Sequence, residues 1–186
     1  VFFNVSGKGS ATPSPATTSN GIATVQLTST EAGIVTVTAT TDADTTGKQT
    51  SVTFRADVGT AKIDSLSASR DSNVKANGTD SSILTATVKD ANGNLVDGAK
   101  VFFSATGKGQ LSPNPATTVN GVATTVLTSL GAESISVTAT TNVDSTGKKV
   151  SVSFIGDSDT ATIADLNASR TENVTANGQD SAMVTA

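Results

Sequence analysis

The amino-acid sequence predicts an all-β protein made of repeated β-sandwich domains. Three features lead to this prediction. Thr, Ser, Ala, Val and Gly dominate the composition; β-branched Val and Thr favour strands, and Gly favours tight turns. Apolar residues alternate with polar ones in short segments, and no segment has the three- and four-residue apolar spacing of a helix. The sequence also repeats itself, which indicates more than one copy of the same domain.

The repeat has an offset of 100 residues and needs no gap. Val-Phe-Phe at residues 1–3 returns at residues 101–103, and more than half of residues 1–86 are identical to their counterparts in 101–186. Longer stretches such as Pro-x-Pro-Ala-Thr-Thr and Ala-Asn-Gly also recur at this offset. Similarity this high indicates recent duplication of a unit of about one domain.

The first complete copy begins with two predicted strands and a turn. Residues 63–70 follow a polar stretch and are the first strand, and residues 82–89 alternate as the second. The apolar face of this second strand consists of Leu84, Ala86 and Val88. The Asp-Ala-Asn-Gly-Asn sequence at residues 90–94 is typical of a turn. A third strand then runs through residues 100–103.

The remainder of the copy contains three more alternating segments. Residues 107–115 read as irregular, Asn-Gly at 120–121 is a strong turn signal, and strands follow at 122–128, 133–140 and 150–154. Four phenylalanines are expected to point inward: Phe3, Phe54, Phe103 and Phe154. About seven short strands in roughly 100 residues is the size and strand count of an immunoglobulin-like sandwich, so tandem sandwiches arranged end to end are predicted.

The domain boundaries are out of register with the ends of the sequence. The complete immunoglobulin-like repeat is predicted at 61–160, with the later strands of an earlier repeat at 1–60 and the first strands of a later one at 161–186. A sandwich that lacks strands exposes an apolar face and unpaired strand edges. We expect flanking chain or another copy to complete the partial repeats, and the second option would give head-to-tail self-association.

The composition argues against catalysis and cofactor binding. The chain has no His and no Cys, so it lacks the usual catalytic pairs, thiol nucleophiles and zinc ligands. Its formal charge of −4 and scattered basic residues do not suit nucleic acid. No apolar run approaches the roughly 20 residues of a membrane span. We therefore predict no enzyme and no nucleic-acid or membrane contact by this segment, and we assign no catalytic, cofactor-binding or metal residue.

Two groups of oxygen-bearing residues merit comparison with a cation site. Residues 90–94 resemble the start of a calcium loop, but Val101 stands where such a loop has its twelfth-position Glu. Asp, Asn and Gly between strands are more typical of turn chemistry, which is the interpretation adopted here. The second group lies at the domain junctions and consists of Asp57, Asp157 and Asp159.

Several motifs resemble the bacterial immunoglobulin-like group 1 (Big-1) repeats of the intimin/invasin family of outer-membrane adhesins. They are Leu-Thr-Ala-Thr-Val-Lys-Asp-Ala-Asn-Gly-Asn at 84–94, Asn-Gly-Val-Ala-Thr at 120–124, Leu-Thr-Ser at 127–129 and Ser-Val-Thr-Ala at 136–139. The downstream motifs recur in the earlier copy. The resemblance covers essentially the whole chain and implies a cell-surface virulence protein, extracellular and anchored to the outer membrane by a region outside this segment.

The favoured function is a structural stalk that projects a distal binding domain, with neighbouring repeats of the same chain as its partners and any host-cell receptor bound elsewhere in the protein. One alternative is that the repeats themselves mediate adhesion or homotypic association. Another is an accessory module of a secreted enzyme. The absence of Tyr and Trp disfavours adhesion by the repeats, because binding hot spots are rich in aromatic residues.

Overall fold

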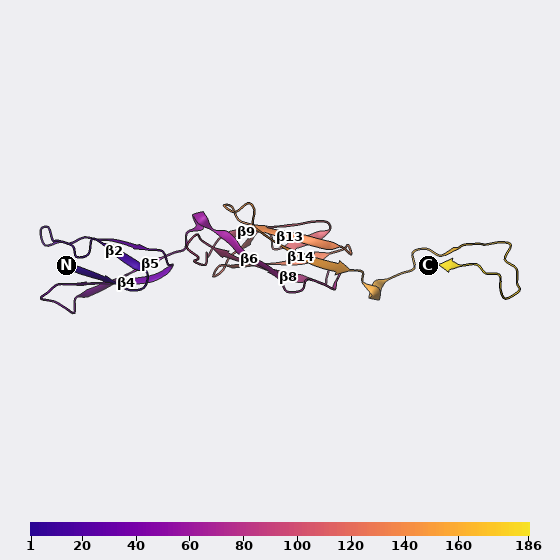
Figure 1. Cartoon of the computed structure of the whole chain (residues 1–186), viewed down its shortest axis with the longest axis horizontal. Coiled ribbons are helices and arrows are strands. Elements are labelled where there is room, and N and C mark those ends of the chain that lie inside the picture. Colours follow the sequence, from indigo (N-terminus) through magenta and orange to yellow (C-terminus); the bar gives the residue numbers. More distant parts are fainter. The chain divides into compact units, whose positions relative to one another are not determined.

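The computed structural model describes all 186 residues, and its regular structure consists of strands and two short 3-10 turns (Figure 1). The chain divides into two units, Val1–Ile155 and Gly156–Ala186, which are described separately. No helix is both long and apolar enough to cross a membrane. The predicted all-β class is confirmed.

The complete sandwich has one four-stranded antiparallel sheet. Its strand order is β10 (Gly109–Ser112), β12 (Val122–Ser129), β8 (Ser82–Lys89) and β6 (Lys62–Ala68). Residues alternate between core and solvent along β8 and β12, because successive side chains of a strand point to opposite faces. The two predicted strands at 63–70 and 82–89 are therefore both present, and they pair with each other.

The second sheet faces the first and contains both short and long strands. Its order is β11 (Ala116–Thr117), β9 (Lys100–Ala105), β13 (Ser134–Thr140), β14 (Lys148–Ile155) and β7 (Val74–Lys75). The chain crosses from the first sheet to the second between β6 and β7. β6 pairs with β8 in the first sheet, whereas β7 pairs in parallel with the end of β14 in the second. This crossover closes one side of the sandwich.

The core lies between these sheets and is built from small and branched side chains. Leu84, Leu127, Ile135 and Val137 are fully buried, and Phe103 and Phe154 are 4% and 3% exposed. Both phenylalanines therefore point inward as predicted. Their counterparts in the first repeat, Phe3 and Phe54, are only half-buried.

Two features of this sandwich differ from the sequence prediction. Residues 107–115 were expected to be irregular, but Gly109–Ser112 forms β10 and pairs with β12. Leu111 is the only large apolar residue in this strand, so the alternation was too short to detect. Strands β7 and β11 were also missed, because the two residues of each carry no periodicity.

Residues 1–60 reproduce the later strands of the complete repeat. They contain β1 (Phe2–Val5), β2 (Gly9–Thr12), β3 (Gln26–Ser29), β4 (Gly33–Thr40) and β5 (Lys48–Phe54). β1, β4 and β5 form one sheet, and β2 pairs with β3. Counterparts of β6 and β8 are not present in this segment. Leu27 is consequently half-buried, whereas its counterpart Leu127 is fully buried.

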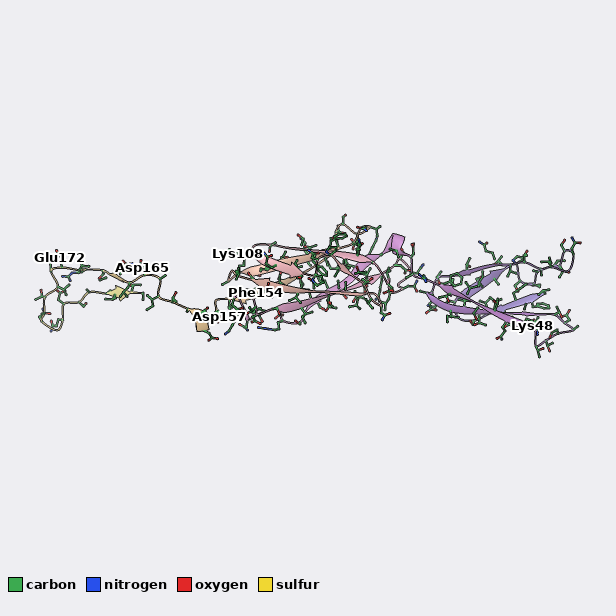
Figure 2. All side chains as sticks on the ribbon, turned by 180° about the vertical axis from the view of Figure 1, so that it is seen from behind. Lys48, Lys108, Phe154, Asp157, Asp165 and Glu172 are labelled. Atoms are coloured by element: carbon green, nitrogen blue, oxygen red, sulfur yellow. The ribbon has the colours of Figure 1, made fainter.

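The unit Gly156–Ala186 has the register of a repeat start without its sandwich. β15 (Asn167–Ala168) pairs with β16 (Val184–Thr185), and Ala168 opposes Val184 just as Ala68 opposes Leu84. The ladder is much shorter than β6 and β8, which contrasts with the full first strand expected here. Ile163 is 76% exposed, but Ile63 is 3% exposed. Asp165 and Glu172 lie in this C-terminal unit (Figure 2). Longer pairing needs a second sheet to bury such residues.

One polar group in the core allows a stability prediction. The Thr125 hydroxyl is buried and has no hydrogen-bond partner, and the first repeat has Val25 at the same position. We expect Thr125→Val to raise the free energy of unfolding by about 1 kcal/mol, because an unsatisfied buried hydroxyl is removed at nearly constant volume. Urea unfolding followed by far-UV circular dichroism measures the change.

The matched control for this substitution is Thr118, which is also buried. Its hydroxyl donates to the Val96 carbonyl at 2.7 Å and accepts from the Ala99 amide at 2.8 Å. Thr118→Val should therefore lower the free energy of unfolding by about 1–3 kcal/mol. Equal effects of the two substitutions would show that hydrogen bonding at these sites does not decide stability.

Candidate functional site

The turn between β8 and β9 is closed by the carboxylate of Asp90, which is 8% exposed. One oxygen, Oδ1, accepts from the amides of Asn92 and Asn94, both at 2.9 Å. The other, Oδ2, accepts from Asn94 Nδ2 at 2.9 Å and from the Asp57 amide at 3.0 Å. The last donor belongs to the linker that precedes the repeat, so Asp90 ties this linker to the turn.

The Asn94 side chain extends the same network into the preceding repeat. Its Nδ2 donates to the Thr30 carbonyl at 3.0 Å, and its Oδ1 accepts from the Ala32 amide at 2.9 Å. Asn94 therefore pairs with the backbone of the loop between β3 and β4, as a strand neighbour would. We call the contacts of Asp90 and Asn94 with residues 30–32 and with Asp57 the joint.

The linker has a conformation that presents its amide to Asp90. Asp57 caps the 3-10 turn η1 (Val58–Thr60), since its Oδ1 accepts from the Gly59 amide at 2.9 Å. The Thr60 hydroxyl accepts from the Ala91 amide at 3.2 Å. The linker is thus bonded both to itself and to the turn at 90–94.

Two further hydrogen bonds join the start of β6 to the loop between β13 and β14. The Thr141 hydroxyl donates to the Ala61 carbonyl at 2.7 Å, and Asp144 Oδ2 accepts from the Ile63 amide at 3.1 Å. Asp144 Oδ1 also closes its own loop by accepting from the Gly147 amide at 3.0 Å. The residues that follow the linker are therefore hydrogen-bonded to this loop of the second sheet as well as to β8.

A surface hollow of about 410 Å³ lies beside the joint. It is lined by Ala32, Arg55, Ala56, Val58, Leu95 and Asp97. Its residues come from both repeats and from the linker. This hollow was not predictable from the sequence, because its lining residues lie far apart along the chain.

Two groups of oxygen-bearing residues were compared with cation sites from the sequence, namely residues 90–94 and the junction acids. Both oxygens of Asp90 are engaged by N–H donors, so residues 90–94 are a hydrogen-bonded turn, as the turn interpretation predicted. Of the junction acids, Asp57 and Asp157 each cap a 3-10 turn of their own. No group of three or more His, Cys, Asp or Glu side chains is placed to hold a metal ion.

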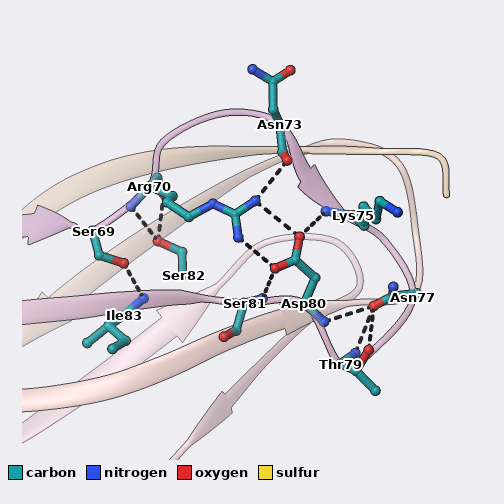
Figure 3. Close-up of polar contacts among 10 residues, drawn as sticks. All are labelled: Ser69, Arg70, Asn73, Lys75, Asn77, Thr79, Asp80, Ser81, Ser82 and Ile83. Atoms are coloured by element: carbon teal, nitrogen blue, oxygen red, sulfur yellow. Dashed lines mark hydrogen bonds and ion pairs between the residues drawn. The ribbon is translucent and has the colours of Figure 1, made fainter.

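A second polar network, in the loop that carries β7, closes the opposite end of the sandwich (Figure 3). The Arg70 guanidinium binds both carboxylate oxygens of Asp80, at 2.6 and 3.1 Å, and donates to the Asn73 carbonyl at 2.9 Å. Asp80 Oδ2 accepts from the Lys75 amide at 2.8 Å. Asn77 Oδ1 accepts from the Asp80 amide at 2.8 Å. Arg70 thereby lowers the pKa of Asp80 well below its usual range.

The same network recurs in the C-terminal unit. Arg170 binds Asp180, and Asp180 accepts from the Thr175 amide at 2.8 Å. It forms there without a surrounding sandwich, because all its partners lie within about a dozen residues. This loop is therefore specified locally, whereas the joint depends on residues far apart in the sequence.

The carboxylate of Asp90 at the joint and that of Asp144, which accepts from the Ile63 amide, make stability depend on pH. Burial raises the pKa of Asp90, but the Asn94 side chain and the amides of Asp57, Asn94 and Asn92 outweigh it and lower the pKa overall. Hydrogen bonding from the Gly147 amide likewise lowers the pKa of Asp144. A lowered folded-state pKa gives stability that is present above the unfolded value of about 3.9 and lost as pH falls through the folded value.

We therefore expect the urea midpoint to fall as pH drops from about 5 to 2, since the unfolded chain binds protons first. Far-UV circular dichroism at each pH measures it. The control Asp90→Asn cannot titrate at the joint, so its midpoint should change less with pH. An unchanged pH profile in this variant would exclude Asp90 as a source of the acid sensitivity.

Sequence reasoning identified the turn at 90–94 but not its partners. Thr30, Ala32 and Asp57 contribute backbone groups to the joint, and every residue has such groups. Their side chains therefore carried no signal. Only the Asp57 side chain, which caps the linker, stood out in the sequence.

The fold and the joint together define a class of protein: an immunoglobulin-like β-sandwich that is hydrogen-bonded to the strand segment preceding it in the chain. Residues 64–155 match the family model described as bacterial Ig-like domain (group 1). The domain formed by these residues belongs to this family, and the resemblance to intimin/invasin-type repeats is confirmed.

Comparison with known proteins agrees with this assignment. The inverse autotransporter adhesin YeeJ of Escherichia coli K12 is 38% identical over 152 residues, which is 81% of this chain but only 6% of that protein. Yersinia pseudotuberculosis InvD has a TM-score of 0.65 at 17% identity, covering 92% of this chain and 52% of that one. Invasin has a TM-score of 0.52 at 24% identity, covering 98% and 37%. These two structures support the fold alone.

Proposed function

We propose that this chain is a stalk segment of a bacterial cell-surface adhesin, in which repeats joined end to end hold a distal binding domain away from the cell. The observation that carries the proposal is the joint. Asn94 bonds the backbone of the preceding repeat through both atoms of its amide, and Asp90 holds the linker. A spacer needs such bonds, because flexible linkers would let the repeats fold back.

The domain limits proposed for this stalk are a complete repeat at 61–160, the later strands of another at 1–60 and the first strands of a third at 161–186. The 100-residue offset supports them, as do the linkers capped by Asp57 and Asp157. Repeats that share more than half of their residues suit a spacer, which requires length and solubility more than a unique surface.

The cellular context of the proposal comes from the relatives. YeeJ is named an inverse autotransporter adhesin, which supports a cell-surface position for this chain, with its outer-membrane anchor and any host receptor site in other regions. The partners of this segment are then its neighbouring repeats, and the proposal gives it no catalytic role.

A second candidate function is homotypic association. Ile163, Met183 and Val184 are 76%, 72% and 62% exposed, and they occupy positions equivalent to β6 and β8, which residues 1–60 lack. Residues 161–186 of one molecule could supply these strands to another. Sedimentation velocity decides this candidate: mass that grows with concentration supports it, and a monodisperse monomer excludes it.

The stalk proposal is tested by a binding titration of the purified chain against host cells and matrix proteins. We expect no saturable binding from folded, monomeric material. Saturable binding that is lost when loop residues such as Arg55 are replaced would contradict the stalk and show that the repeats are adhesive. A companion test varies the number of repeats beneath a fixed binding domain, whose reach from the cell surface should increase with repeat number.

A further inference from the structure

Strand β9 has one neighbouring strand, β13, along its length, and on its other side it meets the segment 113–117. β11 covers the beginning of that side, where Ala116 opposes Val101. Further along, the Phe103 amide donates to Asn114 Oδ1 at 2.9 Å, and Asn114 Nδ2 donates to the Phe103 carbonyl at 2.7 Å. The side-chain amide of Asn114 thus makes both hydrogen bonds that the backbone of another strand would make.

The prolines on either side of Asn114 remove two backbone N–H donors from the segment that covers this edge. Ala116 and Thr118 direct their backbone groups towards β9, since the Thr118 amide donates to the Ala99 carbonyl at 2.9 Å. Pro115 immediately precedes β11 (Ala116–Thr117). Pro115 has no N–H to offer there, and neither has Pro113. A strand that approached this segment would find no N–H donor at either proline.

The first repeat has the same arrangement with a different side chain. The Phe3 amide donates to Ser14 Oγ at 2.9 Å, and Ser14 Oγ donates to the Phe3 carbonyl at 3.1 Å. Ser14 also lies between two prolines, Pro13 and Pro15. The two repeats therefore keep the geometry while the amide is replaced by a hydroxyl. The feature that the two repeats share is therefore a side chain hydrogen-bonded to the amide and carbonyl of the edge strand, whether that side chain is Asn or Ser.

We propose that the segment Pro113-Asn114-Pro115 seals this edge of the sandwich against strand pairing with a second copy. An edge strand with free amides and carbonyls is a template for another chain. The risk is greatest in an array of similar repeats, because every copy presents a matching edge to its neighbours and to other molecules. Asn114 occupies the amide and carbonyl of Phe103, and the two prolines have no N–H to donate to a second copy.

The test compares three variants of the full chain by sedimentation velocity over a range of concentrations. Asn114→Ala frees the amide and carbonyl of Phe103, and Pro115→Thr restores an N–H while it retains the Asn114 side chain. Thr117→Ala, on the same edge, is the control. We expect the average mass of the first two to exceed that of the unmodified chain by about twofold at the highest concentration, and the control to match it.

Equal mass for all variants, with circular dichroism spectra and thermal midpoints of a folded chain, would overturn the proposal. Amide hydrogen exchange gives an independent measurement at low concentration, where association is absent. The Phe103 amide should exchange at least about tenfold faster in Asn114→Ala, since its acceptor is lost. If Asn114→Ala does not fold, Pro115→Thr decides the outcome, because it retains the Asn114 side chain.

Discussion

Replacement of Leu127 by alanine is expected to lower the free energy of unfolding of the complete repeat by about 3–5 kcal/mol. Leu127 lies on β12, is fully buried, and packs in the core between the two sheets. Removing its isobutyl group costs the transfer free energy of the lost carbons and leaves a cavity that surrounding β-sheets cannot readily fill. The chain contains no Trp and no Tyr, so far-UV circular dichroism in urea is the suitable measurement.

The duplicated sequence provides a matched control at Leu27. This residue occupies the same position in residues 1–60, but it is only half-buried, because the strands that would cover it are not present in that segment. Leu27→Ala should therefore cost much less than Leu127→Ala. Equal losses would mean that both segments bury the same core, and the proposed limits of the complete repeat would be wrong.

Replacement of Asp90 by alanine is expected to lower the free energy of unfolding by about 1–3 kcal/mol, because four N–H donors lose their acceptor. These donors belong to Asp57, Asn92 and Asn94, and the last contributes both its amide and its side chain. The loss should appear in the same urea experiment. It should also remove the hydrogen bond that the Asp57 amide of the linker makes to the turn.

The control for Asp90 is Asp64, a carboxylate of the same repeat that faces solvent. It forms an exposed ion pair with Lys89 at 2.8 Å, and such pairs contribute little. Asp64→Ala should therefore change the free energy of unfolding by less than about 1 kcal/mol. A loss as large as that of Asp90→Ala would show that removal of any carboxylate destabilises this chain and that the joint has no special role.

The sandwich was predictable because its strands are amphipathic and because the sequence contains its own comparison. The alternation at 82–89 and 122–128 identified β8 and β12, and the 100-residue offset identified the repeat. Strand β10 escaped prediction because Leu111 is its only large apolar residue. The crossover to β7 escaped because two residues are too few to show a period.

The joint was only half predictable. Asp90 and Asn94 were expected to form a turn, and they do. Their longer-range role was hidden, because the groups that Asn94 binds in the preceding repeat are a backbone carbonyl and a backbone amide more than 60 residues away. A sequence indicates which side chains can bond, but not which distant backbone groups a tertiary fold brings to them.

The most direct test of the stalk proposal is a distance distribution across the joint. The chain has no Cys, so Thr50→Cys and Lys149→Cys can carry two spin labels, one in each repeat, for pulsed electron paramagnetic resonance. A joint held by Asn94 predicts a single narrow distribution that broadens when Asn94→Ala is added. A broad distribution that Asn94→Ala leaves unchanged would contradict the proposal, because the repeats would then move independently and could not hold a distal domain at a defined distance.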